Sequence, residues 1–218
     1  MVSEHVVETF DGPESEADLA LWNLYVPVWA PIEVVAAGGT KGRVLQLRDH
    51  DPYDYALAER AFPPSARGTV EFRVLLKSTG KDILEFELLN QRSERAPRLR
   101  FDSAHAGLTF DLGGAEPEPV PFRAGEWHHV KLLFDGSQGW YDAWVDGEKV
   151  KERVELTISG EALERMVFRT GSWRGDVRML FLDGEPSAPG LDAEDLPAAG
   201  EKVAESVFWI DDVKTTGK

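Results

Sequence analysis

The chain has 218 residues, a formal net charge of −15 and no cysteine. Nucleic acids and anionic membrane surfaces are poor partners for so acidic a protein, because both require a basic footprint. Without cysteine, neither a disulfide framework nor a thiolate metal site can form. No apolar run approaches the ~18 residues that indicate a membrane-spanning helix.

The N-terminal sequence MVSEHVVETF lacks the basic stretch and the following apolar stretch of a signal peptide. A chain whose leader had already been removed would begin in the same way. This end of the sequence therefore leaves the compartment open.

The dominant hydrophobic period along the chain is two, which predicts β-strands that each bury one face. Val70, Phe72 and Val74 alternate with charged residues, and Leu84 and Phe86 follow the same pattern. Further strands of this kind are predicted, in chain order, in RLRFD, GLTFDL, WHHVKLLF, WYDAWVD, RMVFRT, DVRMLFL and SVFWIDDVK. Helical signals are confined to a turn or two in ESEADLALW, DYALAERAF and SGEALERM.

Two stretches are predicted to be surface loops. Residues 114–121 contain prolines that cannot donate to a strand ladder, and residues 183–202 are rich in proline, glycine and acids. Strand patterns lie on both sides of each, so neither is a domain linker. Many short antiparallel strands with one polar face predict two sheets packed face to face. The sequence therefore predicts an all-β, antiparallel two-sheet β-sandwich of the jelly-roll type, as a single domain over residues 1–218.

The segment between Pro52 and Pro63 is too punctuated for a long strand and too aromatic for a free loop. We expect it to pack on the rim of the sandwich, with Tyr55 and Phe62 as its apolar anchors.

Two tryptophans of the stretch WYDAWV, Trp140 and Trp144, flank Asp142 at alternate positions. Both indoles project outward if the alternating residues face the core, namely Tyr141, Ala143 and Val145. An exposed indole needs an apolar partner, and the C–H face of a sugar ring supplies one beside a hydrogen-bonding carboxylate. A covering loop, or a one-residue slip that turns both indoles into the core, explains them equally well.

The run GEWHHVKLLFDGSQGWYDAWVDGEKV resembles the concanavalin A-like lectin/glucanase and laminin-G-like sandwiches. In these, a Trp-His-x-Val strand, an FDG turn and a WVDG hairpin follow one another. VETFDG and FWIDDVK look like the first and last strands of the same superfamily. RDHDPYDYALAERAFPPS and FRTGSWRG more narrowly resemble the sandwich domain attached to sialidase-like and uronate-polysaccharide-degrading β-propeller proteins. In those proteins the propeller carries the chemistry, so the resemblance implies an accessory domain, extracellular or periplasmic.

Arginines are grouped in two places despite the negative total charge. Arg98 and Arg100 belong to a group of four within residues 92–100, and a second group of four spans residues 165–178. Arginine pairs with carboxylates in a bidentate manner, which suits an acidic sugar. Pairing with the chain's own acids explains each single arginine as well. We expect Arg98 and Arg100 to join the two tryptophans and the aspartate of WYDAWV in one ligand groove.

The glucanases of this superfamily carry carboxylates at alternate positions of one strand. In DILEFEL the matching positions hold Ile83, Glu85 and Glu87, so an apolar residue stands where the nucleophile would be. Glu85 and Glu87 are therefore expected to contribute to a ligand-binding face. Catalysis by this pair of glutamates is the alternative, because their spacing alone does not exclude it.

The predicted function is a non-catalytic carbohydrate-binding module that recognises a polysaccharide, with uronates among the candidate sugars. A glycoside hydrolase or polysaccharide lyase on the same fold is the alternative, and a structural domain that docks onto a catalytic partner is a third possibility. The resemblance also implies a structural calcium ion where the chain ends meet, held by Asp211, Glu8 and the carbonyl of Gly42. Ordinary strand-end acids would explain Asp211 equally well.

Overall fold

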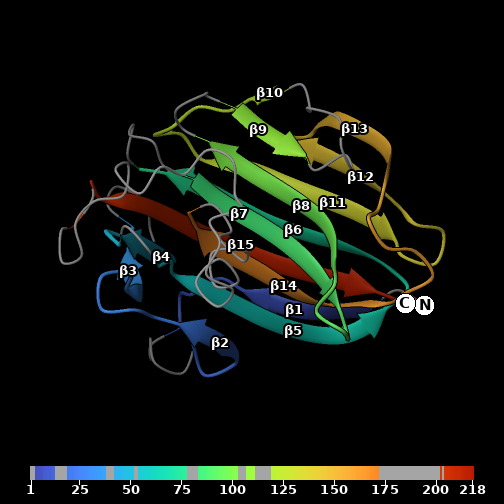
Figure 1. The fold of residues 1–218 in the computed structure, drawn as a ribbon, viewed down its shortest axis with the longest axis horizontal. Helices are drawn as coiled ribbons and strands as arrows, with labels where there is room; N and C mark the ends of the chain where they lie inside the picture. Colours follow the sequence, from blue (N-terminus) through green and yellow to red (C-terminus); the bar gives the residue numbers. More distant parts are fainter. Residues whose placement is uncertain are drawn as a thin grey trace, which may run out of the picture.

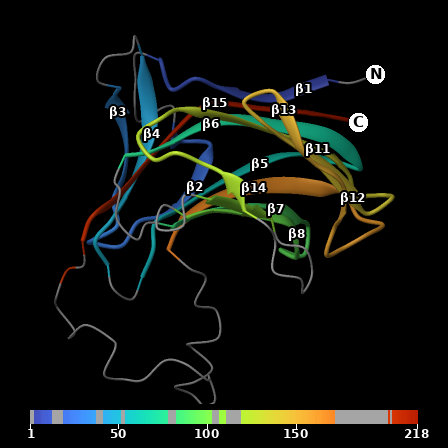
Figure 2. The same ribbon diagram turned by 90° about the horizontal axis from the view of Figure 1, so that it is seen from above.

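The computed structural model describes residues 3–12, 19–37, 42–51, 54–77, 83–102, 107–110, 119–171, 202 and 204–218. In this part of the chain, fifteen strands form two antiparallel sheets (Figure 1). Seen from above, the two sheets lie as two layers (Figure 2). The predicted all-β sandwich is thereby confirmed. No helix in these ranges is long and apolar enough to span a membrane.

One layer is a seven-stranded sheet in the order β10-β9-β8-β7-β14-β5-β2. Its strands are β2 (Trp22–Tyr25), β5 (Leu57–Ser65), β7 (Ile83–Asn90), β8 (Arg95–Asp102), β9 (Gly107–Phe110), β10 (Val120–Pro121) and β14 (Leu163–Thr170).

The other layer is an eight-stranded sheet in the order β13-β12-β11-β6-β15-β4-β3, in which β1 also pairs with β15. Its strands are β1 (Ser3–Glu8), β3 (Ile32–Ala36), β4 (Arg43–Asp49), β6 (Arg67–Leu76), β11 (His128–Asp135), β12 (Trp140–Val145), β13 (Glu148–Glu155) and β15 (Ser206–Gly217). Because Ser3 pairs with Gly217, the two chain ends lie side by side (Figure 1).

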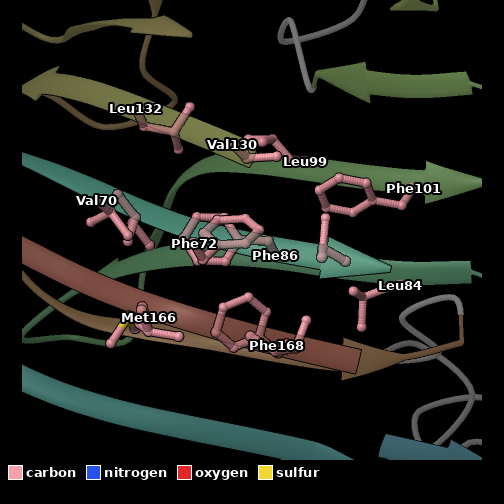
Figure 3. Packing of buried hydrophobic residues seen from close by; sticks show 14 of the residues in the cluster. Val70, Phe72, Leu84, Phe86, Leu99, Phe101, Val130, Leu132, Met166 and Phe168 are labelled. Carbon is pink, nitrogen blue, oxygen red and sulfur yellow. The ribbon is translucent and has the colours of Figure 1, made fainter. Parts of the chain in front are cut away.

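The core consists of the inward-facing side chains of both sheets. Phe72 on β6 is fully buried, with its ring centroid 4.6 Å from that of Phe86 on β7 and 5.0 Å from that of Phe168 on β14. Figure 3 shows these rings meeting between the layers. The alternation seen in the sequence at Val70, Phe72 and Val74 is therefore the inner face of a strand in contact with the opposite sheet.

Several local predictions are wrong. DYALAERAF and SGEALERM contain no described helical turn, since β5 begins at Leu57 and β14 at Leu163. Pairing with β14 and β2 overrides the helical propensity of the alanines and glutamates around β5. Within the predicted loop 114–121, Val120 and Pro121 form the edge strand β10, where a proline is tolerated.

Other predictions can be placed only in part. Phe62 is buried in the core, whereas Tyr55 is half-buried outside it. The predicted strand at 176–182, most of both predicted loops, and Pro52 and Tyr53 lie outside the described residues.

The aromatic centre of the core gives a stability prediction. Phe72→Ala is expected to lower the free energy of unfolding by about 3 to 5 kcal/mol, because a fully buried ring is replaced by a cavity. Val28→Ala, at a side chain that is 93% exposed, is the matched control and should change it by less than about 0.5 kcal/mol. Equal urea midpoints for the two variants would contradict this account of the core.

Candidate functional site

The outward face of the β12 hairpin strand carries both tryptophans of the sequence motif. Tyr141, Ala143 and Val145 are buried in the core, so Trp140, Asp142 and Trp144 project from the opposite face of the eight-stranded sheet. Both indoles are partly buried.

Neighbouring cations lie over these two indoles. The guanidinium carbon of Arg153 lies 4.7 Å from the ring centroid of Trp140, and Nζ of Lys149 lies 5.1 Å from that of Trp144. Both cations belong to β13, and contacts of this kind stabilise by about 0.5 to 1 kcal/mol at exposed sites. The indoles therefore already have intramolecular partners, and a role for them in ligand binding stays a prediction.

Asp142 holds the strand that supplies these cations. Its carboxylate accepts hydrogen bonds from the amide of Arg153 at 2.7 Å and from Nζ of Lys149 at 3.0 Å. Arg153 has a φ of +48° beside a break in the β12–β13 register, which leaves its amide available for a side-chain acceptor. Burial acts to raise the pKa of Asp142, but these two donors outweigh it and lower the pKa below its usual value.

The expected single groove is wrong. Arg98 and Arg100 lie on β8 of the seven-stranded sheet, whereas Trp140 and Trp144 lie on β12 of the eight-stranded sheet. All four side chains point away from the core, so the two pairs lie on opposite outer surfaces of the sandwich. Strand alternation gives the face of a residue but does not say which sheet its strand joins.

The second candidate surface is the outer face of the seven-stranded sheet. Arg169 on β14, Glu85 on β7 and Arg100 on β8 are direct cross-strand neighbours. Glu87, two residues after Glu85 on β7, is paired with Arg98 on β8. The structure thus brings together all four of the predicted residues that lie on this sheet, and it adds Arg169. We call these five residues, Glu85, Glu87, Arg98, Arg100 and Arg169, the charged row.

The acids of the charged row are buried and ion-paired. Glu85, Glu87 and Arg169 are each 3% exposed or less. Arg169 donates a hydrogen bond to Glu85 and lies 3.6 Å from Glu87, which is also 2.8 Å from Nε of Arg95. Burial raises the pKa of Glu87 above its usual value, although Arg169 and Arg95 oppose the rise.

The two β8 arginines of the charged row are the accessible members. The side chain of Arg98 is 32% exposed, with Nη1 4.0 Å from Glu85, and that of Arg100 is 40% exposed, 3.5 Å from Asp102. These distances are longer than those of a good charge-assisted hydrogen bond. The arrangement can present guanidinium groups to an anionic ligand.

The same geometry does not favour catalysis by Glu85 and Glu87. A glycosidase pair needs one carboxylic acid and one carboxylate that both reach the sugar. Here both carboxylates are buried, and both are within ion-pair distance of Arg169. The side chain at the nucleophile position is that of Ile83.

Two tyrosines that the sequence pattern did not single out as ligand residues lie beside the charged row. The ring centroids of Tyr25 and Tyr55 are 5.5 Å apart, and the guanidinium carbon of Arg169 is 5.5 Å from the Tyr55 centroid. Arg169 belongs to the second arginine group of the sequence, of which Arg174 and Arg178 lie outside the described residues. The outward position of Arg169 in the predicted strand RMVFRT was the available sequence signal that it belongs to this surface.

The residues expected to hold calcium do not all meet. Glu8 accepts a hydrogen bond from Arg60 at 3.1 Å, an ion pair that links β1 to β5 of the other sheet. Asp11 instead lies against Gly42: its Oδ1 accepts the amide proton of Arg43, and a Cβ atom on Gly42 would lie only 2.6 Å from that oxygen. Glu8 is thus engaged in an ion pair with Arg60, and calcium binding at this end of the last strand stays a prediction.

Asp211 and Gly42 line one small pocket of about 60 Å³, together with Arg73 and Trp127. Burial raises the pKa of Asp211 to about 6; the like charges of Asp212 and Asp11 add to this rise, while the amide of Asp212 and Arg73 oppose it. No three of the described His, Asp and Glu side chains gather closely enough to hold a metal ion by themselves. Backbone carbonyls and water would have to supply most ligands of a calcium ion here.

Comparison with known proteins decides the family. The model of the sialidase-like CBM domain matches residues 22–177. The chain belongs to this family. Membership makes it a carbohydrate-binding module. No curated protein sequence matches the chain.

Solved structures support the family and the fold. A sialidase superimposes on this CBM domain with a TM-score of 0.80 and 29% identity, over 99% of this chain and 18% of that one. The chain thus spans less than a fifth of that sialidase. The cellulose-induced protein Cip1 (TM-score 0.62, 11% identity, 96% of each chain) shares the fold. So does the polysaccharide lyase family 7 alginate lyase AlgAT5 (TM-score 0.56, 10% identity, 97% of this chain and 92% of that one).

The raised pKa of Asp211 gives a pH prediction for this CBM domain in EDTA. Because the carboxylate form is disfavoured in the folded chain, stability should fall as the pH rises from about 4 through about 6. Asp211→Asn removes this cost, so the fall should be smaller in the variant. The control Glu126→Gln, at an exposed carboxylate, should follow the wild type. Unfolding free energies measured between pH 4 and 8 test this, and equal slopes for wild type and Asp211→Asn would contradict it.

Proposed function

We propose that the chain binds polysaccharides that contain acidic sugars, uronates first among them, on the outer face of its seven-stranded sheet. The observation that carries the proposal is the pair of half-exposed arginines, Arg98 and Arg100, above the buried acids Glu85 and Glu87. Family membership supplies carbohydrate as the ligand class.

The charge around the acid pair favours an anion. Among the described residues, the guanidinium groups of Arg95, Arg98, Arg100 and Arg169 lie beside the carboxylates of Glu85, Glu87 and Asp102. Arginines are thus gathered on this face of a chain whose net charge is −15. A sugar carboxylate that reaches the row can form short charge-assisted bonds with Arg98 and Arg100, whose side chains are 32% and 40% exposed.

The buried acids have a positioning role in this proposal. Glu85 and Glu87 hold Arg169 and attract the β8 arginines, so the guanidinium groups are partly oriented before a ligand arrives. Partial preorganisation lowers the entropy cost of binding. The function needs no proton transfer by either glutamate.

An accessory role fits this binding function. The similar sialidase is more than five times as long as the matched region, so a domain of this fold occurs within a larger chain. We propose that this chain likewise works beside a polysaccharide-degrading catalytic domain, outside the cytoplasm where such substrates occur.

The proposal predicts an effect of Arg98→Ala on acidic glycans. Retention on alginate or polygalacturonate in affinity electrophoresis should weaken by about 1.5 to 3 kcal/mol, the value of a hydrogen bond to a charged group. Retention on the neutral polymers hydroxyethyl cellulose and xylan should not change. Added salt should weaken acidic-glycan binding by the wild type in the same direction.

Arg48→Ala is the matched control for this experiment, because it removes the same charge from the other sheet at a side chain that is 39% exposed. It should bind like the wild type. Retention lost in Trp144→Ala and preserved in Arg98→Ala would contradict the proposal and assign the ligand to the β12 hairpin instead.

We further propose a structural calcium ion held by Asp211, Asp11 and the carbonyl of Gly42. The support is that Asp11 lies against Gly42, and that Asp211, which lines the same small pocket as Gly42, is costly to ionise. Calcium would supply charge compensation and cross-link the last strand to two loops.

Calcium is therefore expected to raise the melting temperature of the wild type relative to EDTA, because it binds only the folded chain. In Asp211→Asn this calcium-dependent rise should be largely lost. The metal content of the starting protein is fixed by elemental analysis. A wild-type melt that is the same with calcium and with excess chelator would rule the ion out.

A further inference from the structure

An exposed tyrosine lies at the edge of the same outer face that carries the charged row. Tyr25 ends β2, the edge strand of the seven-stranded sheet, and is 46% exposed. Its neighbours Trp22 and Leu24 pack on the core, so Tyr25 points outward. Figure 1 shows β2 at the lower left, beside β5.

The ring of Tyr25 is held in place although it is half exposed. Its hydroxyl donates a hydrogen bond to Asp54 at 2.6 Å, and its ring lies 5.5 Å from that of Tyr55 at an interplanar angle of 53°. Tyr55 is itself backed by the guanidinium group of Arg169. An aromatic ring that is held by two such contacts and is open to solvent loses little conformational entropy when a ligand stacks on it.

Tyr25 and the charged row lie on one line across the strands. Tyr25 on β2 is paired with Leu57 on β5, and Leu57 is paired with Arg169 on β14. Arg169 is paired with Glu85 on β7, and Glu85 with Arg100 on β8. Four strand spacings of about 4.8 Å separate the two ends, which is roughly 19 Å.

We infer that Tyr25 is an aromatic subsite that stacks on a pyranose ring of the polysaccharide chain whose acidic residue lies at Arg98 and Arg100. This inference rests on the proposed function. The module then binds an internal stretch of several sugar units that runs across the strands, rather than a single sugar.

A sugar is the ligand that the neighbours of Tyr25 favour at this subsite. The subsite continues directly into the charged row through Tyr55 and Arg169, so one extended ligand can contact both. Polar groups that a sugar's hydroxyls can meet include Asp54, which accepts the hydrogen bond of the Tyr25 hydroxyl, and Asn23, which is exposed two residues earlier on the same face of β2. An apolar surface patch that binds no ligand would not need an aromatic ring held in place by such contacts.

The test compares a monosaccharide with a tetrasaccharide by calorimetry, using galacturonate and linear tetragalacturonate. If alginate is the polymer retained in electrophoresis, mannuronate and its tetramer replace them. Tyr25→Ala should weaken binding of the tetramer roughly ten-fold or more, the scale of one stacking contact, and leave the monomer within about two-fold. The tetramer reaches Tyr25, whereas the monomer at the arginines does not.

Two further variants separate stacking from folding. Tyr25→Phe keeps the ring and should bind the tetramer nearly like the wild type. Val28→Ala, at a side chain that is 93% exposed in the segment after β2, is a control and should also bind the tetramer like the wild type. The chain contains four tyrosines, so the ring signals of Tyr25 and Tyr55 can be assigned in a ¹³C-tyrosine spectrum. The Tyr25 ring signal of the wild type should shift with the tetramer and stay unchanged with the monomer.

The outcomes distinguish this inference from the proposed function. Tyr25→Ala that binds the tetramer like the wild type, or a Tyr25 ring signal that the tetramer does not move, overturns the aromatic subsite. If Arg98→Ala still weakens both ligands in that case, the proposed function stands. Binding that is unaffected by Arg98→Ala, or no binding of either ligand by the wild type, overturns both.

Discussion

The contact between phenylalanines of the two sheets fixes the direction of the side chains on the three strands that carry them, β6, β7 and β14. Phe72 from one sheet meets Phe86 and Phe168 from the other at the centre of the sandwich. Because successive residues of a strand point to opposite faces, burying these rings turns Glu85, Glu87 and Arg169 outward. The charged row is therefore a geometric consequence of the aromatic core on the same strands.

The outer face of the seven-stranded sheet is subject to a second physical constraint, because Glu85 and Glu87 on it are almost fully buried. A buried carboxylate is costly unless a cation and hydrogen bonds compensate it. Arg169 supplies this compensation for Glu85 and Glu87 at once, and Tyr55 packs on its guanidinium group. Such a network links β14, β7 and the segment before β5, and the β8 arginines next to it are more exposed than Arg169.

Aromatic rings on the two outer surfaces of the sandwich have different kinds of neighbours. On β12 the indoles of Trp140 and Trp144 receive cations from the adjacent strand, and Asp142 anchors the bulge that delivers them. On β2 the ring of Tyr25 is braced from the side by Tyr55, and it stays half exposed. Tyr25 is exposed, whereas Trp140 and Trp144 are partly buried, so Tyr25 has the larger accessible fraction.

Whereas the structure chose the register that buries Tyr141, Ala143 and Val145, the amino-acid sequence by itself determined the all-β sandwich and the outward position of Glu85, Glu87, Arg98 and Arg100. These follow from alternation within single strands, which is a local property of the chain. It also indicated the superfamily through motifs that lie close together in the sequence.

Only the tertiary structure decided which strands share a sheet. It separated Arg98 from Trp144, joined Arg169 and Tyr25 to the row, turned Glu8 toward Arg60, and placed Asp11 beside Gly42. Each of these depends on pairing between segments far apart in the chain, as with Arg169 and Glu85. The alternating pattern of one strand is the same whichever partner it hydrogen-bonds to, so such pairings are selected by the packing of the whole sandwich.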